Sequence, residues 1–134
     1  MKVMFDINVV LDIVANRMPF LEHSRAAYLR VVENGDEPCI AVHAVATLSY
    51  LLGGAAVRKK REAAMDWVLS SFKIASAGES EVSAARALSF PDFEDALVAA
   101  CAATSGCERI LTRNMKDFAS SPVLAISPSR FVMS

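Results

Sequence analysis

The sequence predicts a three-layer α/β/α sandwich with a central, mostly parallel sheet, built as one domain over residues 1–134. Short apolar segments of strand length alternate with longer segments that carry apolar residues at helical spacing. This alternation is typical of a parallel sheet covered by helices on both faces. With 54% hydrophobic and 22% charged residues, the chain can bury one core. We find no repeat, low-complexity segment or linker that would divide it.

The first strand is predicted at Val3–Phe5, an apolar run too short for a helix, which ends on the carboxylate of Asp6. A helix should follow, with Asn8 as its N-cap and apolar residues from Val9 onward. In open α/β sheets, ligands bind at the carboxyl ends of the strands, where Asp6 would lie.

The remaining boundaries follow from glycine and proline signals such as Asn34-Gly35, Gly53-Gly54 and Phe90-Pro91. A helix over 20–34 would bury Leu21, Ala26, Tyr28, Leu29 and Val32. Further helices are expected at 43–52, 58–71, 79–88 and 92–104. Strands are expected at 38–42, 72–75, 109–112 and 123–126, before a closing turn through Phe131.

Composition limits the functional classes. A formal net charge of −1 gives no overall attraction to nucleic acid or membranes, so a polyanion would need a local patch or a metal. No apolar run approaches the ~20 residues of a membrane span, and no signal peptide precedes the first strand. Three cysteines without CxxC spacing indicate reduced, mostly buried thiols. We therefore expect a cytoplasmic protein.

Acids and amides recur where a strand ends or a helix begins: Asp6 with Asn8, Asp92 with Asp95, and Asn114 with Asp117. Any one pair after the first is explained by helix capping and the helix dipole. Because parallel strands share one carboxyl edge, however, the groups should converge, and each close pair of carboxylates would repel by roughly 4 kcal/mol at an effective dielectric near 20. A hard divalent cation with oxygen ligands would turn that repulsion into binding.

Three segments, FDINVVLD at 5–12, DFEDALVAA at 92–100 and LTRNMKDF at 111–118, together resemble the signature blocks of PIN-domain proteins. The closest branch would be the VapC-type toxins of toxin–antitoxin pairs. The resemblance implies a Rossmann-like sandwich and a Mg²⁺- or Mn²⁺-dependent endoribonuclease. It implies catalytic and metal-binding roles for Asp6, Asp95 and Asp117, a metal contact from Asn114, and supporting roles for Asn8, Thr47 and Asp92.

The sequence also departs from the family pattern. The family usually has a glutamate in the helix after the second strand, roughly where Thr47 stands, and no carboxylate occurs between Glu37 and Glu62. The position after Thr112-Arg113 is commonly aspartate but is Asn114 here, so Asp117 would substitute for it.

If the site is active, metal ions would activate an in-line water for phosphodiester hydrolysis. Arg113 could contact the scissile phosphate or pair with a nearby acid. The basic stretch Arg58, Lys59, Lys60 and Arg61 would be either a solvated helix face or an RNA-binding rim.

Two other functional classes are compatible with the sequence. One is an enzyme that forms an aspartyl phosphate, although Asp6-Ile7-Asn8 lacks the Asp-x-Asp pattern. The other is a degenerate PIN domain that acts as an RNA- or protein-binding regulatory module without cleavage. A small antitoxin and a homodimeric partner are expected from the resemblance alone.

Overall fold

A computed structural model describes residues 1–53 and 58–134 of the chain. Its centre is a five-stranded sheet with the order β3-β2-β1-β4-β5, in which every pair of neighbours is parallel. The strands are β1 (Lys2–Phe5), β2 (Glu37–Ala41), β3 (Lys73–Ala75), β4 (Cys107–Leu111) and β5 (Ala125–Ile126). The predicted sandwich is confirmed, and the sheet is parallel throughout.

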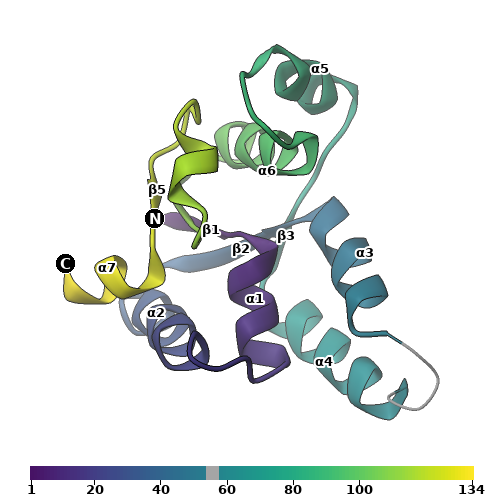
Figure 1. The fold of residues 1–134 in the computed structure, drawn as a ribbon, viewed down its shortest axis with the longest axis vertical. Helices are drawn as coiled ribbons and strands as arrows, with labels where there is room; N and C mark the ends of the chain where they lie inside the picture. Colours follow the sequence, from purple (N-terminus) through teal and green to yellow (C-terminus); the bar gives the residue numbers. More distant parts are fainter. Residues whose placement is uncertain (54–57) are drawn as a thin grey trace.

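Helices follow the strands and cover both faces of the sheet. Helices α5 (Glu79–Ala87) and α6 (Phe93–Thr104) lie on one side, while α1 (Ile7–Val14), α2 (Leu21–Glu33), α4 (Arg58–Ser71) and α7 (Pro128–Met133) lie on the other (Figure 1). Helix α3 (Val42–Leu51) continues directly from β2, and a 3₁₀ turn, η2 (Met115–Phe118), follows β4.

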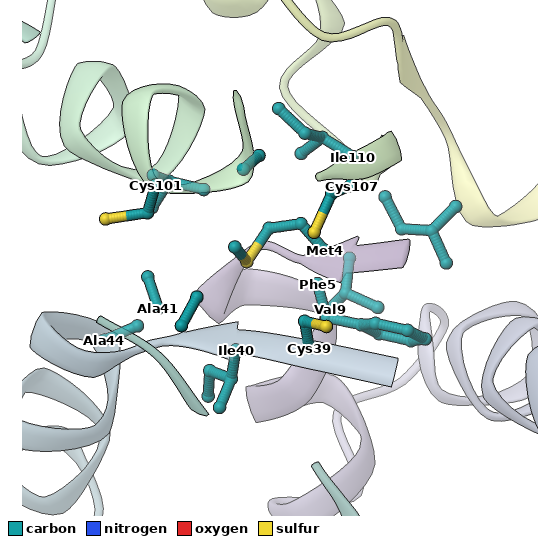
Figure 2. Packing of buried hydrophobic residues seen from close by; sticks show 14 of the residues in the cluster. Met4, Phe5, Val9, Cys39, Ile40, Ala41, Ala44, Cys101, Cys107 and Ile110 are labelled. Carbon is teal, nitrogen blue, oxygen red and sulfur yellow. The ribbon is translucent and has the colours of Figure 1, made fainter. Parts of the chain in front are cut away.

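The core is built on β1, whose Val3, Met4 and Phe5 are fully buried. Figure 2 shows Val9 of α1, Ala44 of α3 and Cys101 of α6 gathered around β1 and β2. On the α2 and α4 side, four rings pack together with centroids 5.2–6.0 Å apart, which is the range of favourable aromatic pairs. These rings are Phe5, Tyr28, Trp67 and Phe72. All three cysteines are buried and free.

Three local predictions were wrong. Asp6, not Asn8, is the N-cap of α1, because the helix begins immediately after β1. Helix α2 buries Ser24, Ala27 and Val31 instead of Leu29 and Val32, whose side chains are 47% and 46% exposed. The closing segment is helix α7, which Ser127 caps through a hydrogen bond from the Arg130 N–H, and not a turn.

The predicted helix end at Gly53-Gly54 is only partly testable, because Gly54 lies outside the described residues. Helix α3 ends at Leu51, and Gly53 has the positive φ of 78° that glycine adopts readily. Within residues 1–53 and 58–134, every helix is too short or too polar to cross a bilayer.

Candidate metal-binding site

The Asp6 side chain is fully buried at the carboxyl end of the central strand. Its backbone N–H donates to the Leu111 carbonyl at 2.9 Å, which fixes the residue against β4. Its carboxylate accepts from the Ile7 N–H at 2.9 Å and from the Thr112 hydroxyl at 2.8 Å. Burial raises the pKa of Asp6 despite these bonds, so the sheet holds a carboxylate that is costly to ionise.

Asp95 lies in the first turn of α6 and is half-buried near Asp6. Burial is the largest cause that raises its pKa, to about 7, and the charges of neighbouring acids add to it. Those acids are Asp6, Asp92, Asp117 and Glu94. Acids from three distant parts of the chain therefore lie close enough to oppose one another's ionisation.

Asp92 is the N-cap of α6. Its carboxylate accepts from the backbone N–H of Glu94 at 2.7 Å and of Asp95 at 3.2 Å. The capping interpretation is therefore correct for Asp92. The same bonds fix the helix start from which Asp95 projects, so capping and support of the site are compatible.

Asn114 and Asp117 lie beyond the end of β4. The Asn114 N–H donates to the Thr112 hydroxyl at 3.0 Å, and that hydroxyl in turn donates to Asp6. Asn114 is the N-cap of η2, and Asp117 lies within this turn, half-buried. The second and third predicted acidic segments thus reach the same rim as Asp6.

The oxygen-rich donor set fits a hard divalent cation such as Mg²⁺ or Mn²⁺. Within the described ranges, however, no three His, Cys, Asp or Glu side chains are already grouped as ligands of one ion. Binding an ion at this rim would therefore require these side chains to move closer together, which a cation favours by neutralising their mutual repulsion.

Thr47 is half-buried on α3, and its side chain contacts Glu94, a residue that the sequence did not lead us to include in the site. Its hydroxyl lies 2.9 Å from Oε1 of Glu94 and 3.2 Å from the His43 carbonyl. Glu94 was recognised only as part of a motif. The one signal in the sequence was its position in the same helical turn as Asp95.

Arg113 forms an ion pair with an acid, which was one of its two predicted roles. Its guanidinium donates to both carboxylate oxygens of Asp12, at 2.9 and 3.2 Å, and lies 3.8 Å above the centre of the Phe20 ring. Asp12 is fully buried and also accepts from Arg17 and Ser24. The chain positions of these residues gave no signal of this network.

The basic stretch at the start of α4 is not next to the acids. Arg58, Lys59 and Lys60 are exposed, while Arg61 donates to the Gly53 carbonyl at 2.8 Å. Lys60 lines a hollow with Val14 and Asn16, near the C-terminal end of α1. Asp6 caps the opposite end of this eight-residue helix, so about 12 Å of helix separates the two features. Asn8 lies between them, in the first turn of α1.

Comparison with known proteins places the chain in a family. The family model of the PIN domain matches residues 2–116, so this protein belongs to the PIN-domain family. The sequence has no significant match among curated proteins.

Solved structures share the fold at low sequence identity. A chain of the VapBC2 complex from Rickettsia felis, bound to a promoter DNA fragment, matches with a TM-score of 0.77 and 18% identity, over 95% of this chain and 98% of that chain. A toxin–antitoxin complex from Klebsiella pneumoniae gives 0.70 and 21%, over 94% and 97%. FitAcB from Neisseria gonorrhoeae gives 0.69 and 15%, over 94% and 97%.

Proposed function

We propose that this protein is a Mg²⁺- or Mn²⁺-dependent endoribonuclease and the toxin of a toxin–antitoxin pair. The observation that carries the proposal is the buried Asp6 at the end of the central strand, with Asp95 beside it at a pKa of about 7. Membership of the PIN-domain family supports the assignment to nucleases. Similarity of fold to chains in toxin–antitoxin complexes supports the toxin role.

Four residues of the chain would bind the metal ion directly. Asp6 and Asp95 would hold the principal ion, with Asp117 and the Asn114 amide oxygen completing its protein ligands. When bound, the cation supplies activation of a water and stabilisation of charge on the phosphate oxygens.

Three further residues keep these ligands in place. The Thr112 hydroxyl orients the Asp6 carboxylate, and its bond to the Asn114 N–H couples the two sides of the rim. Asp92 fixes the first turn of α6 and therefore the position of Asp95. Asn8 lies in the first turn of α1, and its side chain would orient water near Asp6.

Cleavage of a structured RNA with Mn²⁺ present, and with excess chelator as the metal-free control, tests the activity. We expect Asp6→Asn to slow cleavage at least ~1000-fold, or about 4 kcal/mol in the barrier. Asp66→Asn changes an exposed aspartate of α4 and should leave the rate unchanged. An Asp6→Asn protein that still cleaves RNA would contradict the assignment of Asp6 as a metal ligand. RNA binding without cleavage by the wild type would select the regulatory-module alternative instead.

The toxin role and the assembly state need separate tests. Induced expression of the wild-type protein should arrest bacterial growth, whereas Asp95→Asn should not, because it lacks a metal ligand. The homodimer predicts about twice the 14.4 kDa chain mass by light scattering. Equal growth of both strains would contradict the toxin role, and a mass of one chain would contradict the dimer.

A further inference from the structure

Helix α3 has no carboxylate of its own, yet a carboxylate is attached to it from another helix. The Thr47 hydroxyl on α3 lies 2.9 Å from Oε1 of Glu94, which belongs to the first turn of α6. A second contact joins the same two helices, because the His43 ring nitrogen Nε2 lies 3.2 Å from the Glu94 carbonyl. Glu94 therefore extends toward α3 and not along its own helix.

The charge of Glu94 acts on the proposed metal ligands. Glu94 immediately precedes Asp95 in the first turn of α6, and after burial its charge is one of the smaller causes that raise the pKa of Asp6 and of Asp95. Within the described ranges, no lysine or arginine forms an ion pair with Glu94. The half-buried carboxylate thus stands among acids without a neutralising side chain.

A purely structural role explains Glu94 poorly. A glutamine could accept the Thr47 hydrogen bond and join the helices without adding a like charge. The favourable interaction of a first-turn acid with the helix dipole is already supplied by Asp92 and Asp95. A cation bound among these acids would turn the repulsion between Glu94 and its neighbours into binding.

We infer that Glu94 is a ligand of the divalent ion and that Thr47 is its positioning residue. A carboxylate from α6 thereby takes the place of the acid that α3 lacks. This inference rests on the proposed metal-dependent function and assigns it a ligand outside the set Asp6, Asp95, Asp117 and Asn114. The Thr47 hydroxyl holds the Glu94 side chain in the rotamer that reaches α3, as outer hydrogen bonds do for metal ligands.

Mn²⁺ binding by isothermal titration calorimetry, with no RNA present, tests the inference. We expect Glu94→Gln to weaken Mn²⁺ affinity at least ~10-fold, by loss of a ligand charge. Glu79→Gln is the matched control, because Glu79 is an exposed first-turn glutamate of α5. The Mn²⁺ affinity of this variant should equal that of the wild type. Thermal unfolding without metal should show Glu94→Gln to be as stable as the wild type or more so.

Two further variants separate a ligand from a structural contact. Thr47→Val should weaken Mn²⁺ binding, and Thr47→Ser, which keeps the hydroxyl, should restore it. The double variant Thr47→Glu/Glu94→Gln returns a carboxylate to α3 and should bind Mn²⁺ more tightly than Glu94→Gln alone.

The outcomes distinguish this inference from the proposed function. If Glu94→Gln binds Mn²⁺ like the wild type while Asp6→Asn does not, Glu94 is not a ligand and the metal site itself stands. If the wild-type protein does not bind Mn²⁺, the inference and the proposed function both fail.

Discussion

Two fully buried aspartates lie near the two ends of α1, and they differ in whether a cationic side chain binds them. Asp12 receives hydrogen bonds from Arg17, Arg113 and Ser24, so two cations neutralise one carboxylate. Among the described residues, Asp6 accepts hydrogen bonds from the Ile7 N–H and the Thr112 hydroxyl and from no cationic side chain. The nearby charges that act on it are those of Glu94 and Arg113, which oppose each other. Both side chains have no exposed surface.

The difference separates a structural acid from a functional one. A buried charge is tolerated when the protein itself supplies the opposite charge, as it does for Asp12. Among the described residues no side-chain cation forms an ion pair with Asp6, and burial raises its pKa although the charge of Arg113 acts in the opposite direction. The protein therefore keeps the Asp6 carboxylate at an energetic cost that an external cation can offset.

The largest expected effect on stability comes from Asp12. Asp12→Asn leaves Arg17 and Arg113 without their shared charge partner, and we expect a loss of about 3 kcal/mol in the free energy of unfolding. Asp6→Asn keeps an acceptor for the Ile7 N–H and removes like-charge repulsion, so its stability should change by less than about 1 kcal/mol. Urea denaturation without metal measures both. Equal losses in the two variants would remove the distinction between them.

A smaller effect concerns pH. The native pKa of Asp95 is about 7, above its ordinary value of 3.8, so the native state binds the proton more tightly than the unfolded chain. The contribution of this group to stability is complete below pH 3.8 and is lost as the pH rises toward 7. Since Asp95 is only half-buried, water screens the effect, and we expect a loss of about 1 kcal/mol.

The measurement compares denaturation at pH 5 and pH 8 in the presence of chelator. Asp95→Asn should lose less stability than the wild type over this range, because asparagine does not titrate. Added Mn²⁺ should stabilise the wild type most at pH 8, where the ion no longer competes with a proton. A wild-type protein that is more stable at pH 8 than at pH 5 would contradict the sign.

The smallest expected effect concerns RNA binding by the exposed lysines at the start of α4, whose positive charges Asp12 does not neutralise. Lys59 and Lys60 are exposed, whereas the Arg113 guanidinium already binds Asp12. If the start of α4 contacts RNA, Lys59→Ala/Lys60→Ala should weaken RNA binding a few-fold and reduce the slope of log affinity against log salt by about 1.5, since two charges are removed. Fluorescence anisotropy at several salt concentrations measures this slope. An unchanged slope would show that the basic residues at the start of α4 form a solvated helix face and do not contact RNA.

The fold followed from the sequence because its signals are local. Strand and helix lengths, glycine stops and the capping Asp92 lie within a few residues of the boundaries that they set. The rule that parallel strands share one carboxyl edge was sufficient to bring Asp6 and Asn114 to one rim. The N-cap was missed because Asp6 was assigned to the strand, although it serves both elements.

Side-chain pairing could not be predicted, because it depends on rotamers and on contacts between distant segments. Asp12 and Arg113 are 101 positions apart, and Thr47 and Glu94 are 47 apart. The buried face of α2 was misjudged for a related reason. Hydropathy favoured Leu29 and Val32, but α2 packs closely through the small residues Ser24 and Ala27.

The strand order has a consequence for synthesis on the ribosome. Because β1 is the middle strand, it lacks one of its two neighbours until β4 has been made. Asp6 is then held only by α1, since its contacts with Leu111 and Thr112 do not yet exist. The proposed metal ligands therefore assemble only after translation has passed Asp117. A nascent chain that ends before Asp117 lacks at least one of these acids.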